Sequence, residues 1–183
     1  MKKAIIITFE NYQDHEVIYP YYRLIEEGFD VSIMSSKVGR IHGILGTHME
    51  SDQSVDVLKG VQQFEKYLDD YDLMIIPGGV TSTWEKLRQE KQVLDFINEF
   101  DKRSKTIGCI CHGVQIIISA KITNGRDVSG YYTLKDDINN SGACFVDAPC
   151  VISKNLVTSP HYKYNTEWIK GVLEVYRTWR VNK

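Results

Sequence analysis

The chain has 183 residues, of which 43% are hydrophobic and 25% charged, and its formal net charge is −2 at pH 7. These values are typical of one soluble globular domain with a substantial core, and we expect a single domain over residues 1–183. Lys and Arg are spread along the chain, which argues against nucleic-acid binding because that function needs a clustered basic surface. No apolar stretch approaches the ~20 residues of a membrane span, and the apolar segment at residues 4–9 is too short for a signal peptide.

The cysteines and histidines lack the spacing of a disulfide scaffold or of a metal site. We therefore expect reduced thiols in a cytoplasmic protein that needs no metal or organic cofactor. The residues concerned are Cys109, Cys111, Cys144, Cys150, His15, His42, His48 and His161.

In chain order, the first half of the sequence alternates between apolar, β-branched runs and amphipathic segments, which predicts strands that alternate with helices. Strands are predicted at residues 3–9, 29–34 and 72–77, and helices at 16–27 and, in two pieces, at 81–100. Residues 38–54 contain three glycines and only short apolar runs, so we expect hairpin-like strands or a loop at one edge. Residues 55–71 are expected to form a short helical or irregular connection.

The second half continues this alternation with shorter elements. Strands are predicted at residues 106–110, 126–130, 144–151 and 155–159, and helices at 114–120, 134–141 and 167–179. The opening β-α-β unit has short connections, which indicates a parallel sheet. The whole pattern predicts a doubly wound α/β domain with helices on both faces of a mostly parallel sheet.

Residues 105–120 (KTIGCICHGVQIIISA) carry the main chemical signal. Cys111 lies between an apolar strand and an apolar helix, and such a turn lifts a side chain out of the sheet. The free N–H groups and the positive end of the helix favour a thiolate there. A buried, inert cysteine is the alternative, and the residue types alone leave both interpretations open.

Two other segments reach the same edge of the predicted sheet, where ligands bind in folds of this kind. Gly78-Gly79 forms either a simple tight turn or an oxyanion hole of exposed backbone N–H groups. Glu16 is either a first-turn acid or a partner of Cys111. An ionised Glu16 would raise the thiol pKa, whereas a protonated Glu16 would donate a hydrogen bond to the thiolate. His112 is an awkward base for Cys111, because adjacent helical residues do not face each other.

Several segments in their order along the chain carry a family resemblance. The sequence resembles the ThiJ/PfpI family, in particular PfpI-like intracellular cysteine hydrolases of the glyoxalase, deglycase or peptidase type. This resemblance implies a flavodoxin-like fold similar to that of class I glutamine amidotransferases. The matching segments are DHEVIYPYYRLIEEGFDV (14–31), DLMIIPGG (72–79), IGCICHGVQIIISA (107–120), LKDDINNSGACFVD (134–147) and NLVTS (155–159).

The resemblance also implies roles for individual residues. Cys111 would be the nucleophile, His112 its catalytic neighbour, and Glu16 the acid that is hydrogen-bonded to the sulfur. Gly79 and the backbone of His112 would form the oxyanion hole. Glu85 of a neighbouring subunit would complete the triad with the histidine, which implies a homodimer or a dimer-built hexamer.

Two features depart from the family pattern. Val114 stands where family members often have proline, and residues 159–165 (SPHYKYN) replace a polar, Arg-containing stretch.

These observations lead to three hypotheses of different classes. The first is a stress-related, cysteine-dependent hydrolase or lyase acting on a reactive carbonyl or acyl group in a small molecule or peptide. The second is a non-enzymatic redox-sensing stress protein or chaperone with an oxidisable Cys111. A glutamine amidotransferase is weaker, because His161 and Glu167 lack the two-residue spacing of that superfamily.

Overall fold

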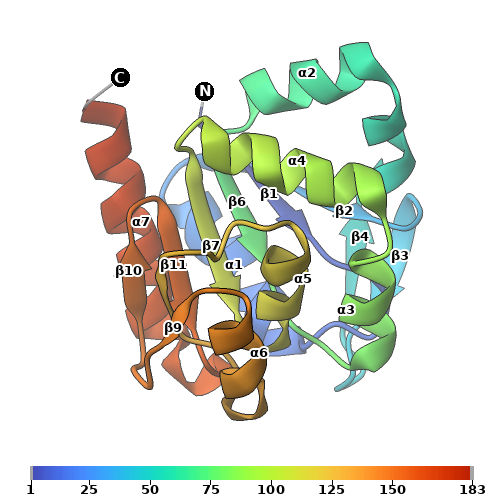
Figure 1. The fold of residues 1–183 in the computed structure, drawn as a ribbon. Coiled ribbons are helices and arrows are strands. Elements are labelled where there is room, and N and C mark those ends of the chain that lie inside the picture. Colours follow the sequence, from blue (N-terminus) through green and yellow to red (C-terminus); the bar gives the residue numbers. More distant parts are fainter. Residues whose placement is uncertain (1, 182–183) are drawn as a thin grey trace.

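The computed structural model describes the backbone of residues 2–181 and the side chains of residues 2–179 (Figure 1). Seven strands form a central sheet: β1 (Lys2–Ile7), β2 (Phe29–Ser35), β5 (Gln53–Ser54), β6 (Leu73–Ile76), β7 (Thr106–Ile110), β10 (Val151–Ser153) and β11 (Leu156–Ser159). Their spatial order is β10-β11-β7-β6-β1-β2-β5, and every neighbouring pair is parallel except β10 with β11. The predicted doubly wound, mostly parallel sheet is therefore confirmed.

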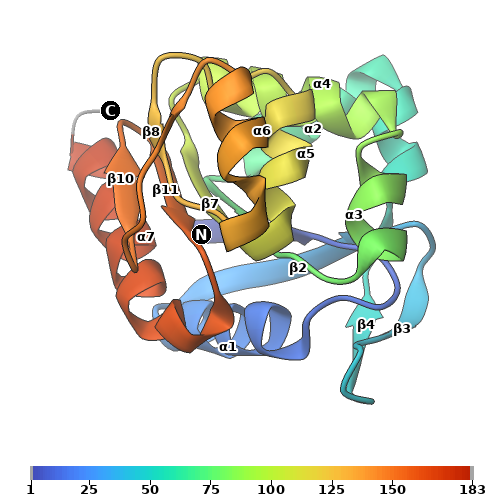
Figure 2. The ribbon, with the colours of Figure 1, turned by 60° about the horizontal axis from the view of Figure 1, so that its bottom comes forward.

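Helices cover both faces of the sheet (Figure 2). One face carries α1 (Asp14–Glu26) and α7 (Asn165–Val181), and the other carries α2 (Val61–Asp70), α4 (Lys91–Lys102) and α5 (Val114–Ser119). The shorter helices α3 (Thr81–Leu87) and α6 (Lys135–Asn140) lie towards the carboxyl ends of the central strands. Within residues 2–181, no helix combines the length and the apolar character that a bilayer span requires.

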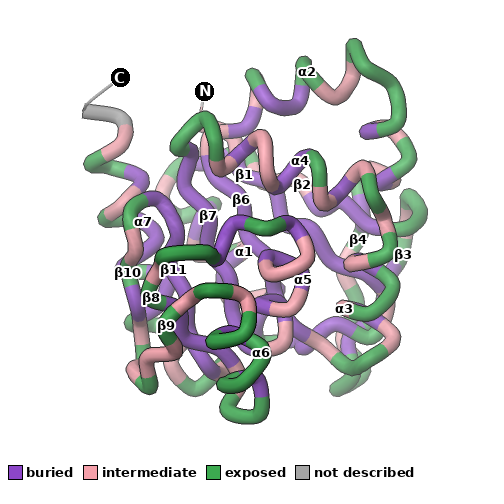
Figure 3. Tube along the Cα trace, in the orientation of Figure 1, coloured by how far each residue is buried: buried purple, intermediate pink, exposed green. Residues whose placement is uncertain are grey.

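Strand β1 explains why the sheet needs both helical layers. Its side chains point alternately to the two faces, so Ala4 and Ile6 contact the layer of α1 and α7, whereas Ile5 and Ile7 contact the opposite layer. Burying each isoleucine contributes about 1.5–3 kcal/mol to folding. Figure 3 shows the strands as a largely buried layer inside the more exposed helices.

The structure refines the edges of the predicted pattern. The glycine-rich segment forms a hairpin of β3 (Gly39–His42) and β4 (His48–Ser51), followed by β5. Residues 55–71 are more regular than predicted, with the 3₁₀ turn η1 (Val55–Lys59) before α2. The 3₁₀ turns η3 (Tyr132–Leu134) and η4 (Tyr162–Tyr164) precede α6 and α7.

The predictions for strands at 126–130 and 144–151 were wrong in extent. Only β8 (Asp127–Val128) and β9 (Cys144–Phe145) form there, and they pair with each other in a separate small sheet. Pro149 lies between β9 and β10, where its missing N–H prevents a continuous strand ladder.

The connection from β7 to α5 packs tightly against the end of β6. It begins with the 3₁₀ turn η2 (Cys111–Gly113). A Cβ atom on Gly113 would lie 2.7 Å from the Ile76 carbonyl oxygen and 2.8 Å from that of Pro77. Because these oxygens belong to the backbone, they cannot move aside as a flexible side chain would. Gly113 therefore allows the turn η2, which begins at Cys111, to lie beside the end of β6.

We expect Gly113→Ala to lower the free energy of unfolding by roughly 1–3 kcal/mol, the usual cost of overpacking. The matched control is Gly60→Ala, because a Cβ atom there meets its nearest atom at 3.7 Å. This control should cost less than about 1 kcal/mol, since Gly60 only caps a helix. Urea denaturation measures both values, and equal losses in the two variants would contradict the argument from close packing.

Candidate active site

Cys111 occupies a strained turn directly after β7. Its φ angle is +59°, a left-handed conformation that is uncommon for residues other than glycine. The side chain is buried, with 7% of its residue surface exposed. This is the backbone geometry of a nucleophile elbow, and strain of this kind persists only where the surrounding structure enforces it.

His112 reaches the sulfur despite being the next residue in the chain. Its Nδ1 lies 3.4 Å from Cys111 Sγ, because the elbow is not regular helix. The imidazole lies between two rings: Trp84 at 6.0 Å with an interplanar angle of 9°, and Tyr131 at 4.4 Å with an angle of 29°. Burial lowers the pKa of His112, so the imidazole is neutral near pH 7 and able to accept a proton.

Glu16 is fully buried at the start of α1. Its Oε2 accepts a hydrogen bond of 2.7 Å from the Gly78 backbone N–H. Burial raises the pKa of Glu16 to about 7, and the hydrogen bonds with Gly78 and the Cys111 side chain oppose this rise. The predicted pairing of Glu16 with Cys111 is therefore present in the structure.

The Cys111 thiol and the Glu16 carboxyl form a coupled pair. Burial raises the pKa of Cys111, the charge of ionised Glu16 raises it further, and the His112 backbone N–H lowers it. A thiolate beside an ionised carboxylate is thus strongly disfavoured. A negative charge on the sulfur therefore requires the proton to stay on Glu16, and the two groups titrate together.

The double glycine lies against the elbow, although Gly78 and Gly79 contribute differently. A Cβ atom on Gly78 would lie 2.8 Å from Glu16 Oε2 and 3.1 Å from the His112 backbone nitrogen. Gly79 is fixed between two backbone hydrogen bonds of 3.3 Å, from Gln13 N–H to the Gly78 oxygen and from Val80 N–H to the Asn11 oxygen. The missing side chain of Gly78 thus lets its backbone lie close to Cys111, whereas a side chain on Gly79 would meet Thr83 and the Asn11 carbonyl oxygen instead.

Glu85 is not placed beside His112 within one chain. It lies on the exposed side of α3, and among the described residues it forms no hydrogen bond or ion pair with His112. Its neighbour Trp84 faces the imidazole instead.

Sequence reasoning missed the rings around His112, because Trp84 and Tyr131 are distant in sequence and match no catalytic motif. It considered Gly78-Gly79 as a turn or an oxyanion hole and did not predict that the Gly78 N–H donates a hydrogen bond to the Glu16 carboxyl. In the sequence, Trp84 and Tyr131 are marked only by their positions after predicted strands. Such a position does not distinguish a residue of the site from a residue of the hydrophobic core.

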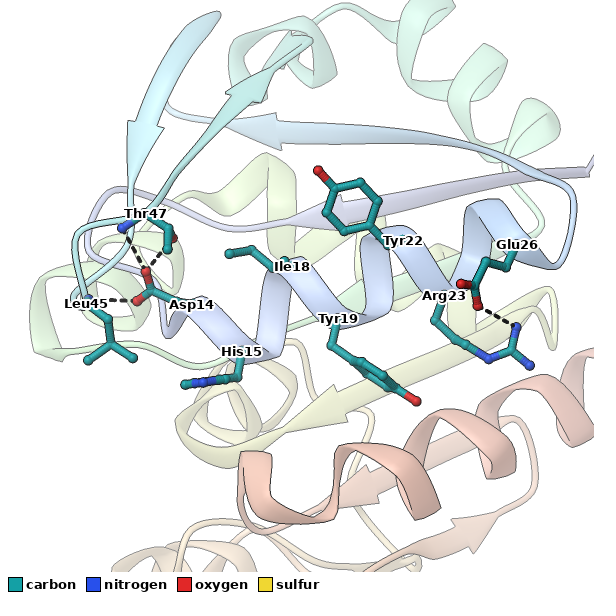
Figure 4. Close-up of a pocket in the computed structure, with 9 residues that line it drawn as sticks. All are labelled: Asp14, His15, Ile18, Tyr19, Tyr22, Arg23, Glu26, Leu45 and Thr47. Carbon is teal, nitrogen blue, oxygen red and sulfur yellow. Dashed lines mark hydrogen bonds and ion pairs between the residues drawn. The ribbon is translucent and has the colours of Figure 1, made fainter.

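A cavity of about 330 Å³ follows the outer face of α1, and its lining includes Asp14 but not Glu16 or Cys111 (Figure 4). Asp14 Oδ2 accepts a hydrogen bond of 2.8 Å from the Leu45 backbone N–H, and its other oxygen binds the backbone and side chain of Thr47. Burial alone would raise the pKa of Asp14, but these hydrogen bonds outweigh it and lower the pKa. The Asp14 carboxylate therefore holds the loop that contains Leu45 and Thr47, whereas the Glu16 carboxyl lies beside Cys111.

The described residues contain no group of three or more His, Cys, Asp or Glu side chains arranged to hold a metal ion. All four cysteines are free thiols, and Cys111 is the one that lies beside an imidazole and a buried carboxyl.

A profile of the DJ-1/PfpI family matches residues 2–175. The chain belongs to the DJ-1/PfpI family. It is 32% identical over 172 residues to Deglycase PfpI of Pyrococcus furiosus, which covers 92% of this chain and 98% of that protein. It is also 32% identical over 175 residues to Deglycase TK1284 of Thermococcus kodakarensis, covering 96% of this chain and 99% of the relative. The crystal structure of a ThiJ/PfpI domain protein from Brachyspira murdochii has the same fold, with a TM-score of 0.84, 19% identity and 96% of each chain covered.

The raised pKa of Glu16 predicts a specific dependence of stability on pH. The folded chain keeps a proton on Glu16 up to pH about 7, whereas the unfolded chain loses it near the ordinary value of 4.5. Stability from this group is therefore present below pH 4.5 and is lost as the pH rises through 7. The stability difference between wild type and Glu16→Gln should fall by roughly 3 kcal/mol from pH 4.5 to pH 8.

Urea denaturation of both proteins at the two pH values measures this change. Glu26→Gln is the matched control, because it removes an exposed carboxylate from the helix that carries Glu16. Its pH dependence should remain that of wild type. A difference between wild type and Glu16→Gln that does not change with pH would show that Glu16 is ionised in the folded protein.

Proposed function

We propose that this protein is a cytoplasmic, cysteine-dependent enzyme that acts on small reactive carbonyl compounds, of the glyoxalase or deglycase type. The observation that carries this proposal is the elbow itself. Cys111 Sγ lies 3.4 Å from His112 Nδ1 and beside the buried Glu16 carboxyl, which can keep its proton near pH 7. This arrangement supplies a nucleophile, a base and a proton donor within one small volume. Family relatives that bear the name deglycase support the same class of substrate.

In the proposed reaction, the Cys111 thiolate attacks the aldehyde carbon of an α-oxoaldehyde. The backbone N–H groups of Gly79 and His112 stabilise the resulting oxyanion. Neutral His112 then moves a proton from the former aldehyde carbon to the neighbouring ketone carbon, which leaves a thioester on the sulfur and a hydroxyl group on the neighbouring carbon. Water hydrolyses the thioester and releases a 2-hydroxy acid and the free thiol. The aldehyde carbon is oxidised while the ketone carbon is reduced, so the reaction needs no external oxidant and adds one water molecule overall. Glu16 holds the proton that would otherwise quench the thiolate.

Turnover of methylglyoxal tests this proposal directly. We expect wild type to form lactate, and Cys111→Ala to lose at least 1,000-fold in kcat/KM because the nucleophile is absent. Cys144→Ala is the matched control, since Cys144 is an exposed free thiol, and it should keep wild-type activity. If wild type turns over no aldehyde, acyl ester or peptide, yet loses the Cys111 thiol at low peroxide concentrations, the redox-sensor hypothesis replaces the enzyme.

We further propose that the active form is a homodimer or a dimer-built hexamer in which Glu85 of one subunit completes the site of another. Glu85 is exposed and adjacent in sequence to Trp84, which faces His112, so a second subunit docked at this edge would supply a carboxylate partner for the imidazole. A carboxylate in that position would orient His112 and stabilise its protonated form.

Mixing two inactive variants tests this arrangement. Cys111→Ala and Glu85→Ala should each lose activity alone, whereas hybrid dimers combine an intact Cys111 in one subunit with an intact Glu85 in the other. After complete subunit exchange at equal concentrations, we expect roughly a quarter of the wild-type activity to return. Subunit exchange is verified by native mass spectrometry, and full exchange without recovery would exclude Glu85 from this role.

A further inference from the structure

Six rings from separate parts of the chain form one continuous row that contains the catalytic imidazole. We call it the aromatic row, and its members in spatial order are Trp84, His112, Tyr131, His161, Tyr162 and His15. Beyond the contacts of His112, neighbouring ring centroids are 6.3 Å apart for Tyr131 and His161, 4.1 Å for His161 and Tyr162, and 4.9 Å for Tyr162 and His15.

The imidazole of His161, in the outer half of the row, is uncharged near pH 7. His161 Nδ1 accepts the Lys163 backbone N–H at 3.2 Å, so the tautomer with a proton on Nε2 is favoured. Burial and the nearby Lys163 charge both lower the pKa of His161, which keeps it neutral. Lys163 itself is engaged with neighbouring rings, since its ammonium lies 4.7 Å from the Tyr164 ring and 5.8 Å from the Tyr132 ring.

The outer end of the row is partly open to a ligand. The ring planes of His161 and Tyr162 are tilted by 41° to each other, so the two rings do not lie flat against one another. Tyr162 is 37% exposed. Ring edges carry partial positive charge and attract the negative face of another aromatic ring in edge-to-face contacts.

We propose that the aromatic row is a binding subsite for an aromatic or other planar group on the molecule that reacts with Cys111. The row passes through His112, whose Nδ1 is 3.4 Å from the sulfur, and it extends from there to His161 and Tyr162. This inference rests on the proposed function only in that Cys111 is the reacting group. Carbonyl compounds that carry an aryl group, such as aryl glyoxals, would then be better substrates than small aliphatic carbonyl compounds.

Alkylation of Cys111 tests the subsite without requiring turnover. Iodoacetamide and its N-phenyl analogue iodoacetanilide react in the same way: the thiolate forms a C–S bond, the C–I bond breaks, and iodide leaves. They differ only in the phenyl group. The measured quantity is kinact/KI for each reagent, divided by its rate with free glutathione, with modification of Cys111 verified by peptide mass spectrometry. We expect wild type to favour iodoacetanilide on the order of 10-fold after this correction, through a lower KI.

Loss of a ring should remove this preference. Tyr162→Ala and His161→Ala should each reduce the ratio of the two reagents at least three-fold, whereas Tyr162→Phe keeps the ring and should keep the ratio. Tyr22→Ala is the matched control, because Tyr22 is an exposed tyrosine on α1, outside the aromatic row. Thermal unfolding of each variant verifies that it is folded. Because two alanine variants at different positions are measured, the test still gives a result if one of them does not fold.

A corrected ratio near one in wild type, or a preference for the phenyl reagent that survives both alanine substitutions, would overturn the subsite. These results are separate from the test of the proposed function. Selective labelling without turnover of methylglyoxal or phenylglyoxal would reject the enzyme and keep the subsite. Turnover of both aldehydes without selective labelling would keep the enzyme and reject the subsite.

Discussion

The buried carboxyl of Glu16 beneath the Cys111 sulfur is the interaction on which the site depends. A carboxyl group that is fully removed from water holds its proton to pH about 7, while its Oε2 is fixed by the Gly78 N–H at 2.7 Å. A rigid proton donor beside a thiol allows negative charge on the sulfur without a second charge nearby. Burial of Glu16 therefore costs stability at alkaline pH, and in the proposed function it would keep the proton on Glu16 while the sulfur carries the negative charge.

The sheet topology explains how three distant segments meet at this point. The chain passes from β1 to β2 on one side and later to β6 on the other, so the connections after β1 and β6 diverge at the carboxyl edge. Glu16 follows β1, Gly78 follows β6, and Cys111 follows β7, the next strand along. A crevice at such a switch point is where doubly wound sheets bind ligands. The glycines at positions 78 and 113 remove the Cβ atoms that would otherwise separate these connections.

Sequence patterns predicted the parts of the structure that depend on burial. Strands buried on both faces read as continuous apolar runs, so β1, β6 and β7 were recognisable, and the residues after them lie together at one edge of the sheet. Pairing at the sheet margin was less predictable, because β8 and β9 have two residues each and carry no periodicity. The contacts of His112 with Trp84 and Tyr131 join residues far apart in sequence and depend on how α3 and η3 fold back over the elbow.

The surroundings of His112 define which part of its proton chemistry one chain can supply. Nδ1 faces the sulfur at 3.4 Å, and the flanking rings of Trp84 and Tyr131 hold the imidazole plane. Burial favours the neutral ring, which suits a base but makes the protonated intermediate costly. Stacked rings can orient an imidazole, yet only an anion can offset the charge that it acquires. A single chain thus positions the base, and a carboxylate at the remaining ring nitrogen is the element that would stabilise its protonated state.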